Sequence, residues 1–537
     1  MFRQLLTPVA DNLAASVLVG AIPIAAVLIL LGVLRRPAWQ AALAGLAVAL
    51  ALAVTVWKMP PLLALDSVAA GAVFALWPVM WIVVNALLLY NIAVRSGRFD
   101  ALRRWVLRHL PDDRRVVLVV IGFCFGALLE GVAGFGAPVA ITSALLIAMG
   151  LPPLQAITYT LIFNTAPVAF GALGAPITTL GAVTQLPVHD LASMVGRQLP
   201  FMALLLPFYV IGLYGGLKSL KALWPVLIVA GVSFGLGQFV TSNFLSYELT
   251  DVVSSITSLF GTLAFLRVWK PAYDPEYALD RGAAQSALLK DEAGQPPAWQ
   301  GWLPWITVAV VVLVWTTVKL NLIGEHKVQW PGLHNAVFIT LYGKPYAAVW
   351  SWQPLATGTA ILFAAAVTAL MVGLRPKEIL LAARDTWVQG RLAILTVTLI
   401  VGLAYLLNYS GIAYTLGLGA ASAGLLFPIL SAFLGWLAVF LSGSDTSGNA
   451  LFGNLQVVAA RQLGLDPVLI AATNSTGGVL GKMISPQNIA TGVSVTELKG
   501  REGEVLRRTF KHSVILTLLL GLLVLAQQYL FPWMIPR

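Results

Sequence analysis

The sequence predicts an all-α polytopic membrane protein with two inverted-topology repeats, broken helices, re-entrant hairpins and about 12–14 membrane spans. Three observations support this fold class. The chain of 537 residues is 59% hydrophobic and 10% charged, with a mean hydropathy of +0.86, whereas soluble domains carry about 25% charged residues. Lys and Arg gather in alternate connections between apolar runs. Two polar, glycine-rich stretches interrupt apolar segments in corresponding parts of the two halves.

The apolar runs define the expected spans in chain order. They lie near 14–34, 38–57, 67–94, 116–149, 198–217, 222–241, 252–267, 302–319, 354–373, 392–408, 430–463 and 512–531. Two further apolar units, 154–183 and 467–497, carry polar breaks. Segment 116–149 is too long for one ordinary span, and 154–183 is short for two. We therefore expect 116–149 to cross the membrane with a break, and 154–183 to form a re-entrant hairpin with its tip near 164–174. Segments 430–463 and 467–497 should repeat this from the cytoplasmic side.

The basic residues predict the orientation of the chain in the membrane. Most of them fall at 35–36, 95–115, 218–221, 267–290, 375–391 and 499–511. The positive-inside rule places these connections in the cytoplasm, which puts both termini on the periplasmic side. The net charge of +11 is explained in this way and does not indicate nucleic-acid binding. The aromatic residues of 320–353 suit a loop at the membrane interface.

The loop charges also indicate an internal repeat. Alignment of residue 130 with residue 444 brings 150–153 onto 464–467, and a shift of about one helical turn then brings 164–165 onto 474–475. The basic 95–115 maps onto uncharged 409–429, as an inverted repeat requires. We expect a first repeat with two linking spans over 1–267 (core unit 116–183), a cytoplasmic linker over 268–301 and a second repeat over 302–537 (core unit 430–497).

The first polar stretch runs from Glu130 to Pro138 and is followed by Asn164–Pro167. Gly134, Gly136 and Pro138 disfavour a regular helix, and unwound backbone at membrane depth is tolerated where it is buried in protein or lines a cavity. A half-helix N-terminus at this break would offer N–H donors to a carboxylate. Close packing of helices through small residues is the alternative explanation.

Three ionisable residues fall inside the core units: Glu130, Asp445 and Lys482. Such residues within a membrane commonly mark ion or proton pathways. We expect Glu130 or Asp445 to carry a proton and Lys482 to attract an anionic substrate. The alternatives are a structural ion pair between Asp445 and Lys482 and a helix-capping role for Glu130.

Neutral hydrogen-bonding side chains cluster at both breaks. The candidates for substrate binding are Asn164, Thr165, Ser444, Thr446, Asn449, Asn474, Ser475, Thr476 and Gln487, together with Gly134, Gly136 and Lys482. Ser and Thr hydroxyls also bond back to helix carbonyls, which is the structural alternative.

An enzyme is disfavoured, because the five histidines lie in loops or at span ends without metal-ligand spacing. A phosphate-binding Gly-x-x-x-x-Gly-Lys-Ser/Thr motif is absent from the sequence, which argues against ATP drive within this chain. We expect no cofactor and no metal. Cys124 is the single cysteine, so the chain has no intramolecular disulfide.

Several motifs together resemble the L-lactate permease family. They are Gly126–Pro138, Asn164–Gly171, Ser442–Ser447, Thr476–Gly478, Gly481–Gln487 and Lys511–Ser513. The resemblance covers nearly the whole chain. It implies transport of L-lactate, glycolate and D-lactate with protons across the bacterial inner membrane, and membership of a superfamily with a mobile transport domain and a fixed scaffold. Gly448 departs from the expected Ser or Ala, and the 268–301 linker departs in composition.

These observations favour a secondary active transporter that imports L-lactate and related small 2-hydroxymonocarboxylates by proton symport. The resemblance to that superfamily implies that core units 116–183 and 430–497 would move and that spans such as 14–94 and 302–408 would form the scaffold. A sodium-coupled carboxylate or dicarboxylate transporter of the same superfamily is the alternative, and an anion channel is the remote one. The expected partners are the monocarboxylate, protons and the lipid bilayer, with a homodimer left open.

Overall fold

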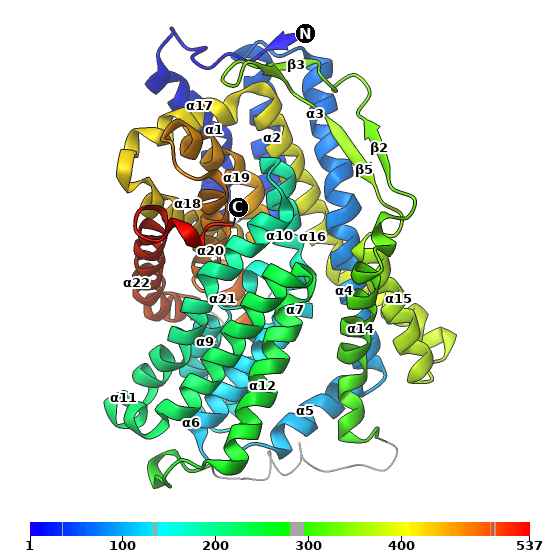
Figure 1. Cartoon of the computed structure of the whole chain (residues 1–537), viewed down its shortest axis with the longest axis vertical. Helices are drawn as coiled ribbons and strands as arrows, with labels where there is room; N and C mark the ends of the chain where they lie inside the picture. Colours follow the sequence, from blue (N-terminus) through cyan, green and yellow to red (C-terminus); the bar gives the residue numbers. More distant parts are fainter. Residues whose placement is uncertain (35, 133–136, 280–294, 495, 499–500, 537) are drawn as a thin grey trace.

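The computed structural model describes residues 1–34, 36–132, 137–279, 295–494, 496–498 and 501–536 as an elongated bundle of helices (Figure 1). Within these ranges, 10 helices are long and apolar enough to cross a membrane. One of them, α11 (Val188–Phe244), contains two antiparallel arms, because the chain reverses at Gly216 and brings Gly196 against Ser242 and Gly235 against Pro200. The prediction of an all-α polytopic membrane protein is confirmed.

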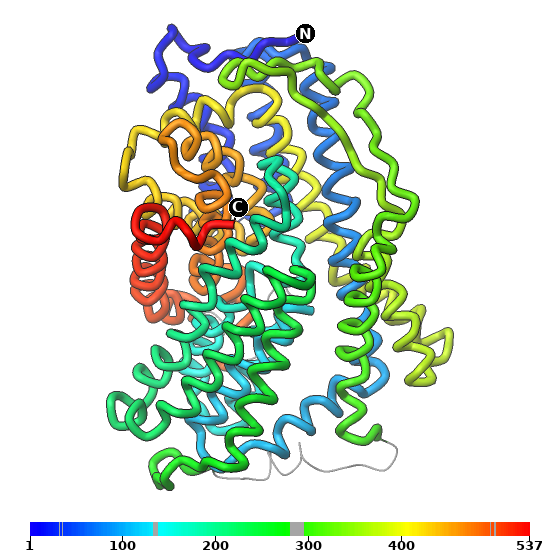
Figure 2. The backbone as a smooth tube through the Cα atoms, in the orientation of Figure 1, coloured from blue at the N-terminus to red at the C-terminus, as the bar shows by residue number. Residues whose placement is uncertain are grey.

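Seven of the described helices outside the predicted core units pack together although the first four are far in sequence from the last three. They are α1 (Leu13–Gly32), α2 (Ala38–Thr55), α3 (Pro61–Phe74), α4 (Trp81–Arg95), α14 (Leu303–Thr317), α15 (Thr357–Met371) and α16 (Pro376–Ser410). The Asn12 side chain caps α1 by accepting a bond from the Ala15 amide, and Pro61 begins α3 where its missing N–H costs nothing. Figure 2 shows α16 beside the N-terminal α2 and α3.

The 320–353 connection is more ordered than the loop that the sequence predicts. Strand β2 (His326–Gln329) pairs antiparallel with β5 (Val349–Trp352). Strand β3 (Val337–Ile339) lies between β1 (Phe2–Arg3) and β4 (Lys344–Pro345). The sheet that contains β3 covers the end of the bundle at which the N-terminus lies, and the β2–β5 pair runs from there along one side of the bundle (Figure 1). Pairing satisfies backbone groups that the short extended segments leave open.

The opposite end of the bundle carries α5 and the linker. Helix α5 (Arg98–Arg108) forms inside the predicted basic loop, buries Phe99, Leu102 and Val106, and packs against η6 (Ala298–Trp302). The ordered start of the linker is held by an ion pair of 2.9 Å between Lys218 and Asp274. The hydrogen bond from Lys218 holds the pKa of Asp274 below its usual range. The 268–301 segment is thus anchored on both sides of residues 280–294, which lie outside the described residues.

The first core unit differs from the predicted arrangement. Helices α6 (Arg114–Val117), η2 (Leu118–Phe125) and α7 (Gly126–Val132) run inward, and α8 (Ala137–Ala148) follows. Arg114 then donates to the Gly150 carbonyl at 3.4 Å, so both ends of this unit lie at the same end of the molecule. The described parts of 114–148 therefore return to the end of the molecule from which they start, which differs from the single crossing predicted for 116–149.

The next segment crosses the bundle. Helix α9 (Pro153–Phe163) leads through η3 (Val168–Phe170) to α10 (Gly171–Thr184), with a bend of 64° that leaves the chain travelling onward. The Val183 carbonyl accepts a bond from Asn408, whose own carbonyl accepts one from Gln4 near the N-terminus. Segment 153–184 is thus a broken span, and the prediction of a re-entrant hairpin there is wrong. A break in a helix does not by itself predict whether the chain continues across the membrane or turns back, because the polar backbone at the break is buried in protein in both cases.

The second core unit has the same order of elements. Helices α18 (Phe427–Ser442) and α19 (Asp445–Gln462) form a hairpin in which Ser431 bonds to Gln456. Both ends of this hairpin meet the C-terminal part of α22 (Glu502–Tyr529), through Tyr529 to Leu425 and Asp466 to Gln528. Helices α20 (Pro467–Lys482) and α21 (Pro486–Ser494) form the broken span. Residues 474–478 lie inside α20, and the break in this unit follows at 483–485.

Candidate functional site

The centre of the two core units holds a buried ion pair that joins the two halves of the chain. Lys482 Nζ lies 2.5 Å from Glu130 Oε1, and the two side chains are 7% and 2% exposed. Asn164 Nδ2 donates to Glu130 Oε2 at 3.0 Å. Three predicted site residues from α7, α20 and the break after α9 therefore meet at one point.

Helix ends and a close backbone approach position this pair. Lys482 is the last residue of α20, where the partial negative charge of the helix C-terminus favours a cation. Gly171 begins α10 against Glu130, and a Cβ at this position would lie 3.2 Å from Glu130 Oε1. The next residues, Ala172 and Leu173, have φ of +46° and +54°. Such left-handed conformations persist in non-glycine residues where the surroundings hold them, and they cluster at functional sites.

A cavity of about 40 Å³ lies beside the ion pair. Its lining comes from both halves and comprises Glu130, Val168, Gly171, Ala172, Pro176, Gly443, Ser444, Asp445, Thr446, Lys482 and Gln487. A water molecule needs about 10–15 Å³ of such space, so the cavity has room for a few waters but is too small for a carboxylic acid in this arrangement. The site combines one ammonium group, two carboxyl groups and neutral hydroxyl and amide donors.

Asp445 lies in the first turn of α19, directly after the Ser444 side chain that caps this helix. Its Oδ2 accepts bonds from Ser475 at 2.5 Å and from Asn449 at 3.2 Å. Its Oδ1 has no hydrogen-bond partner within the described parts of the chain. Lys482 forms its ion pair with Glu130 in this arrangement. The alternative from the sequence, a structural ion pair between Asp445 and Lys482, is therefore not formed here.

Other predicted residues hold the framework together. Asn474 accepts a bond from Gln456 and donates to Asn449, and Thr476 donates to Gln198 at 2.7 Å. Thr165 bonds back to the Ile162 carbonyl, which is the structural alternative for a hydroxyl near a helix end. Ser444, Thr446 and Gln487 do line the cavity. Gly134 and Gly136 lie outside the described residues.

Sequence reasoning missed Asp251. The loop between two apolar runs was expected to include it, yet it lies in α12 (Thr250–Val268) and is 1% exposed. It packs against Gly131, the residue that follows Glu130. The available signal was the apolar run beginning directly after it, because a helix start can bury its first-turn residues as fully as the rest of the span.

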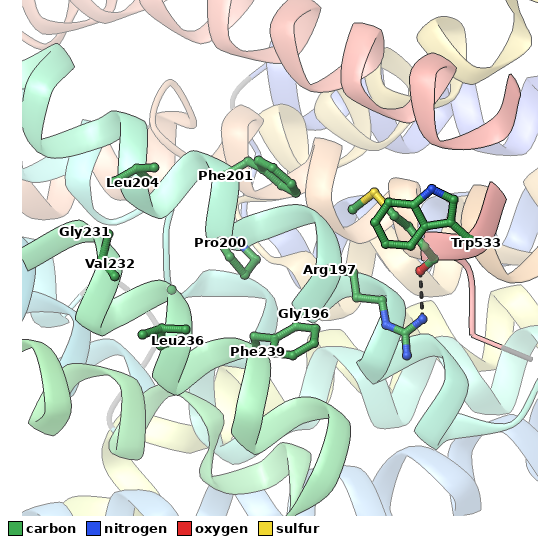
Figure 3. A pocket seen from close by; sticks show the side chains of 12 residues that line it. Gly196, Arg197, Pro200, Phe201, Leu204, Gly231, Val232, Leu236, Phe239 and Trp533 are labelled. Atoms are coloured by element: carbon green, nitrogen blue, oxygen red, sulfur yellow. Dashed lines mark hydrogen bonds between the residues drawn. The ribbon is translucent and has the colours of Figure 1, made fainter. Parts of the chain in front are cut away.

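A larger pocket of about 390 Å³ lies between the two arms of α11 and the C-terminal turn η9 (Pro532–Met534) (Figure 3). Its walls are largely apolar side chains such as Phe201, Leu236 and Phe239. Arg197 already donates to the Met534 carbonyl and to Asn243, each at 2.8 Å. The pocket has none of the buried charge chemistry of the central cavity, which we therefore take as the candidate site.

Comparison with known proteins identifies the family of the chain. Residues 16–531 match the family described as L-lactate permease. The chain is 41% identical to the L-lactate permease of Bacillus subtilis (strain 168), with 100% of each chain covered. It is 40% identical to the glycolate permease GlcA of Escherichia coli (strain K12) and 40% identical to the L-lactate permease of that strain, with 98% of each chain covered in both cases. The chain belongs to the L-lactate permease family.

Proposed function

We propose that this protein imports L-lactate and related small 2-hydroxymonocarboxylates, including glycolate and D-lactate, by proton symport across the bacterial inner membrane. The observation that carries the proposal is the buried Glu130–Lys482 pair, which lies between two hairpins and two broken helices. The names of the relatives, L-lactate permease and glycolate permease, support the substrate class. The proposed activity is transport of the substrate across the membrane without any covalent change to it.

The lining of the cavity suits a 2-hydroxy acid. Lys482 supplies the positive charge for the substrate carboxylate, and Ser444, Thr446 and Gln487 supply groups that can bond its hydroxyl and its second carboxylate oxygen. The cavity must enlarge to admit the substrate, and movement of a hairpin tip is the simplest way to open it. Of the remaining candidates, Asn164 and Ser475 would act by holding Glu130 and Asp445.

Proton and substrate binding would favour each other through charge. A substrate carboxylate must compete with Glu130 for Lys482, and Asp445 adds a further carboxyl group to the same cavity. A proton on one of these acids lowers the negative charge around Lys482 and so strengthens binding of the anion. By linkage, the bound anion strengthens proton binding by the same factor. Glu130 and Asp445 are the two proton sites that the sequence proposes.

The two core units, near 116–183 and 430–497, would form the moving part, and the helices of 14–94 and 302–408 the scaffold. We retain the division into repeats at 1–267 and 302–537, joined by a cytoplasmic linker at 268–301. In support, each half supplies one hairpin and one broken span in the same chain order. Basic loops in the cytoplasm and periplasmic termini complete the proposed orientation.

The test is uptake of labelled L-lactate into proteoliposomes with proton and sodium gradients imposed separately. One proton per lactate gives about tenfold accumulation for a pH difference of about one unit. Accumulation driven by sodium alone, with no response to the proton gradient, would support the alternative. Competition by glycolate but not by a four-carbon dicarboxylate is expected, because the cavity contains one lysine.

Two variants test the proton sites named by the sequence. Glu130→Gln and Asp445→Asn are compared with the unmodified protein in the same vesicles. Loss of gradient-driven accumulation in one of them identifies a coupling carboxyl. Full accumulation in both would show that the proton binds elsewhere.

A further inference from the structure

Among the buried acids that the structure describes, Asp251 is the one whose two carboxyl oxygens both lack a hydrogen-bond partner. It is 1% exposed, and neither carboxyl oxygen has a hydrogen bond within the described parts of the chain. Glu248, one turn earlier, is also buried, but it accepts bonds from Thr357 at 2.8 Å and from Ser246 at 2.5 Å. Buried polar groups are nearly always bonded, so an orphaned carboxyl requires an explanation.

The position of Asp251 connects it with the candidate site. A Cβ at Gly131 would lie 2.6 Å from the Asp251 Cβ, so α7 and α12 are in direct contact here. Gly131 directly follows Glu130 in α7, the inner arm of the first hairpin. The first hairpin therefore covers Asp251, and the same hairpin supplies the acid that binds Lys482.

The surrounding charges favour the neutral, protonated form of Asp251. The ammonium group of Lys482 is already held by Glu130. A buried carboxylate without a counter-charge or donors pays a large desolvation cost. The first turn of α12 offers a favourable helix dipole, but this effect is smaller than the cost of an unpaired buried charge.

The remaining titratable neighbours do not change this balance. Glu130 precedes Gly131 on α7 and its charge acts on Asp251, and Glu248 and Tyr247 lie on η4 (Tyr247–Leu249), which precedes α12. The Tyr247 hydroxyl is hydrogen-bonded to Thr178, and Cys124 on η2 is bonded to Ser258, two turns further along α12. Both acidic neighbours would repel a second negative charge.

We propose that Asp251 carries the coupling proton of the symport. Its carboxylate takes a proton from water when the first hairpin uncovers it on one side of the membrane, and an O–H bond forms. The proton stays on Asp251 while α7 covers it, and it returns to water when the carboxyl is uncovered on the other side. Glu130 then serves to hold Lys482 ready for the substrate. This inference rests on the proposed symport, and it assigns the coupling proton to Asp251 in place of Glu130 and Asp445, the two proton sites that the sequence proposes.

Asp251→Asn in the full-length chain tests the proposal, because the Asn side chain resembles the protonated acid in shape and cannot release a proton. Two assays are run in the same proteoliposomes: accumulation of labelled L-lactate driven by a pH gradient, and exchange of labelled for unlabelled L-lactate at equal pH. Exchange does not require the proton to leave the carrier. We expect exchange within about twofold of the unmodified protein, and accumulation reduced from about tenfold to simple equilibration.

Glu248→Gln is the matched control, since it neutralises a buried acid one turn away whose bonds a neutral side chain can largely keep. It should retain both activities. Unchanged accumulation by Asp251→Asn would overturn the proposal. Loss of exchange in a variant that remains monodisperse would also overturn it, because Asp251 would then be needed for the structure of the site. Failure of the unmodified protein to respond to a pH gradient would instead refute the proposed symport itself.

Discussion

At the scale of single residues, the protein concentrates its buried charge at one point. Glu130 and Lys482 are far apart in sequence, yet their charged atoms lie 2.5 Å apart in a site almost without exposure. Such a pair adds little net stability over apolar side chains, but loss of one partner leaves an uncompensated charge. The pair is thus better explained by its use in binding than by its contribution to folding.

Lys482→Gln should lower the free energy of unfolding by about 3–5 kcal/mol, because Glu130 would remain buried without its counter-charge. The double variant Glu130→Gln, Lys482→Gln should recover most of this loss, since both charges are gone. Neither should bind lactate. Thermal unfolding in detergent, with lactate binding measured on the same samples, checks both statements.

The exposed Arg501–Glu504 pair is the control for that measurement. Its charged atoms lie 2.7 Å apart with side chains 56% and 43% exposed. Removal of Arg501 should change stability by less than about 1 kcal/mol. A double variant as unstable as Lys482→Gln alone would contradict the view that the uncompensated charge causes the loss.

At the scale of elements, the second hairpin packs against the broken helix α20 through glycine residues. A Cβ at Gly435 in α18 would overlap the backbone oxygen of Asn474 in α20. Cβ atoms at Gly477 and Gly481 would similarly overlap backbone oxygens of α18, those of Ala432 and Trp436. Because backbone atoms cannot move aside as a side chain can, these positions fix how closely the second hairpin lies on the helix that bears Lys482.

Gly435→Ala should therefore destabilise the protein by about 1–3 kcal/mol through overpacking and should displace Lys482 relative to Glu130. Thermal unfolding and lactate transport are the measurements. Gly503→Ala in α22 is the control, since a Cβ there meets nothing within 4 Å. A gain of about 0.5–1 kcal/mol is expected for it, as for an exposed helix position. Equal effects of the two changes would refute the close-packing explanation.

At the scale of the whole molecule, the two hairpins enter the bundle from different ends. The first has both ends beside Arg114 and Gly150, and the second has both ends beside the C-terminal part of α22. Each hairpin is followed by a broken span that completes the crossing. The central cavity lies where these four elements meet.

Cysteine accessibility distinguishes this arrangement from the one predicted by the sequence. Single cysteines replacing Asp112 and Pro152 should react with a membrane-impermeant reagent from one side of the membrane. Those replacing Leu425 and Gln462 should react from the other side. Cys124 is buried and can remain in place. Labelling of positions 112 and 152 from opposite sides would show that 116–149 crosses the membrane after all.

The sequence by itself determined the class of protein and most of the spans, and it predicted the charged residues of the candidate site. Composition, loop charge and the polar breaks suffice for this. A charged side chain or an unpaired backbone group inside a membrane is unfavourable in free energy wherever it occurs, so its position can be read from the local sequence. Glu130, Asp445 and Lys482 were found for that reason.

Only the tertiary structure decided which polar segment turns back and which continues, and which acid pairs with Lys482. A glycine-rich break permits either path, and the choice depends on packing against distant helices such as α12, α20 and α22. The absence of a hydrogen-bond partner for Asp251 among the described residues was likewise decided by the tertiary structure. Its lack of a partner follows from where α7 and Lys482 lie in space, and these positions are not properties of the sequence around residue 251.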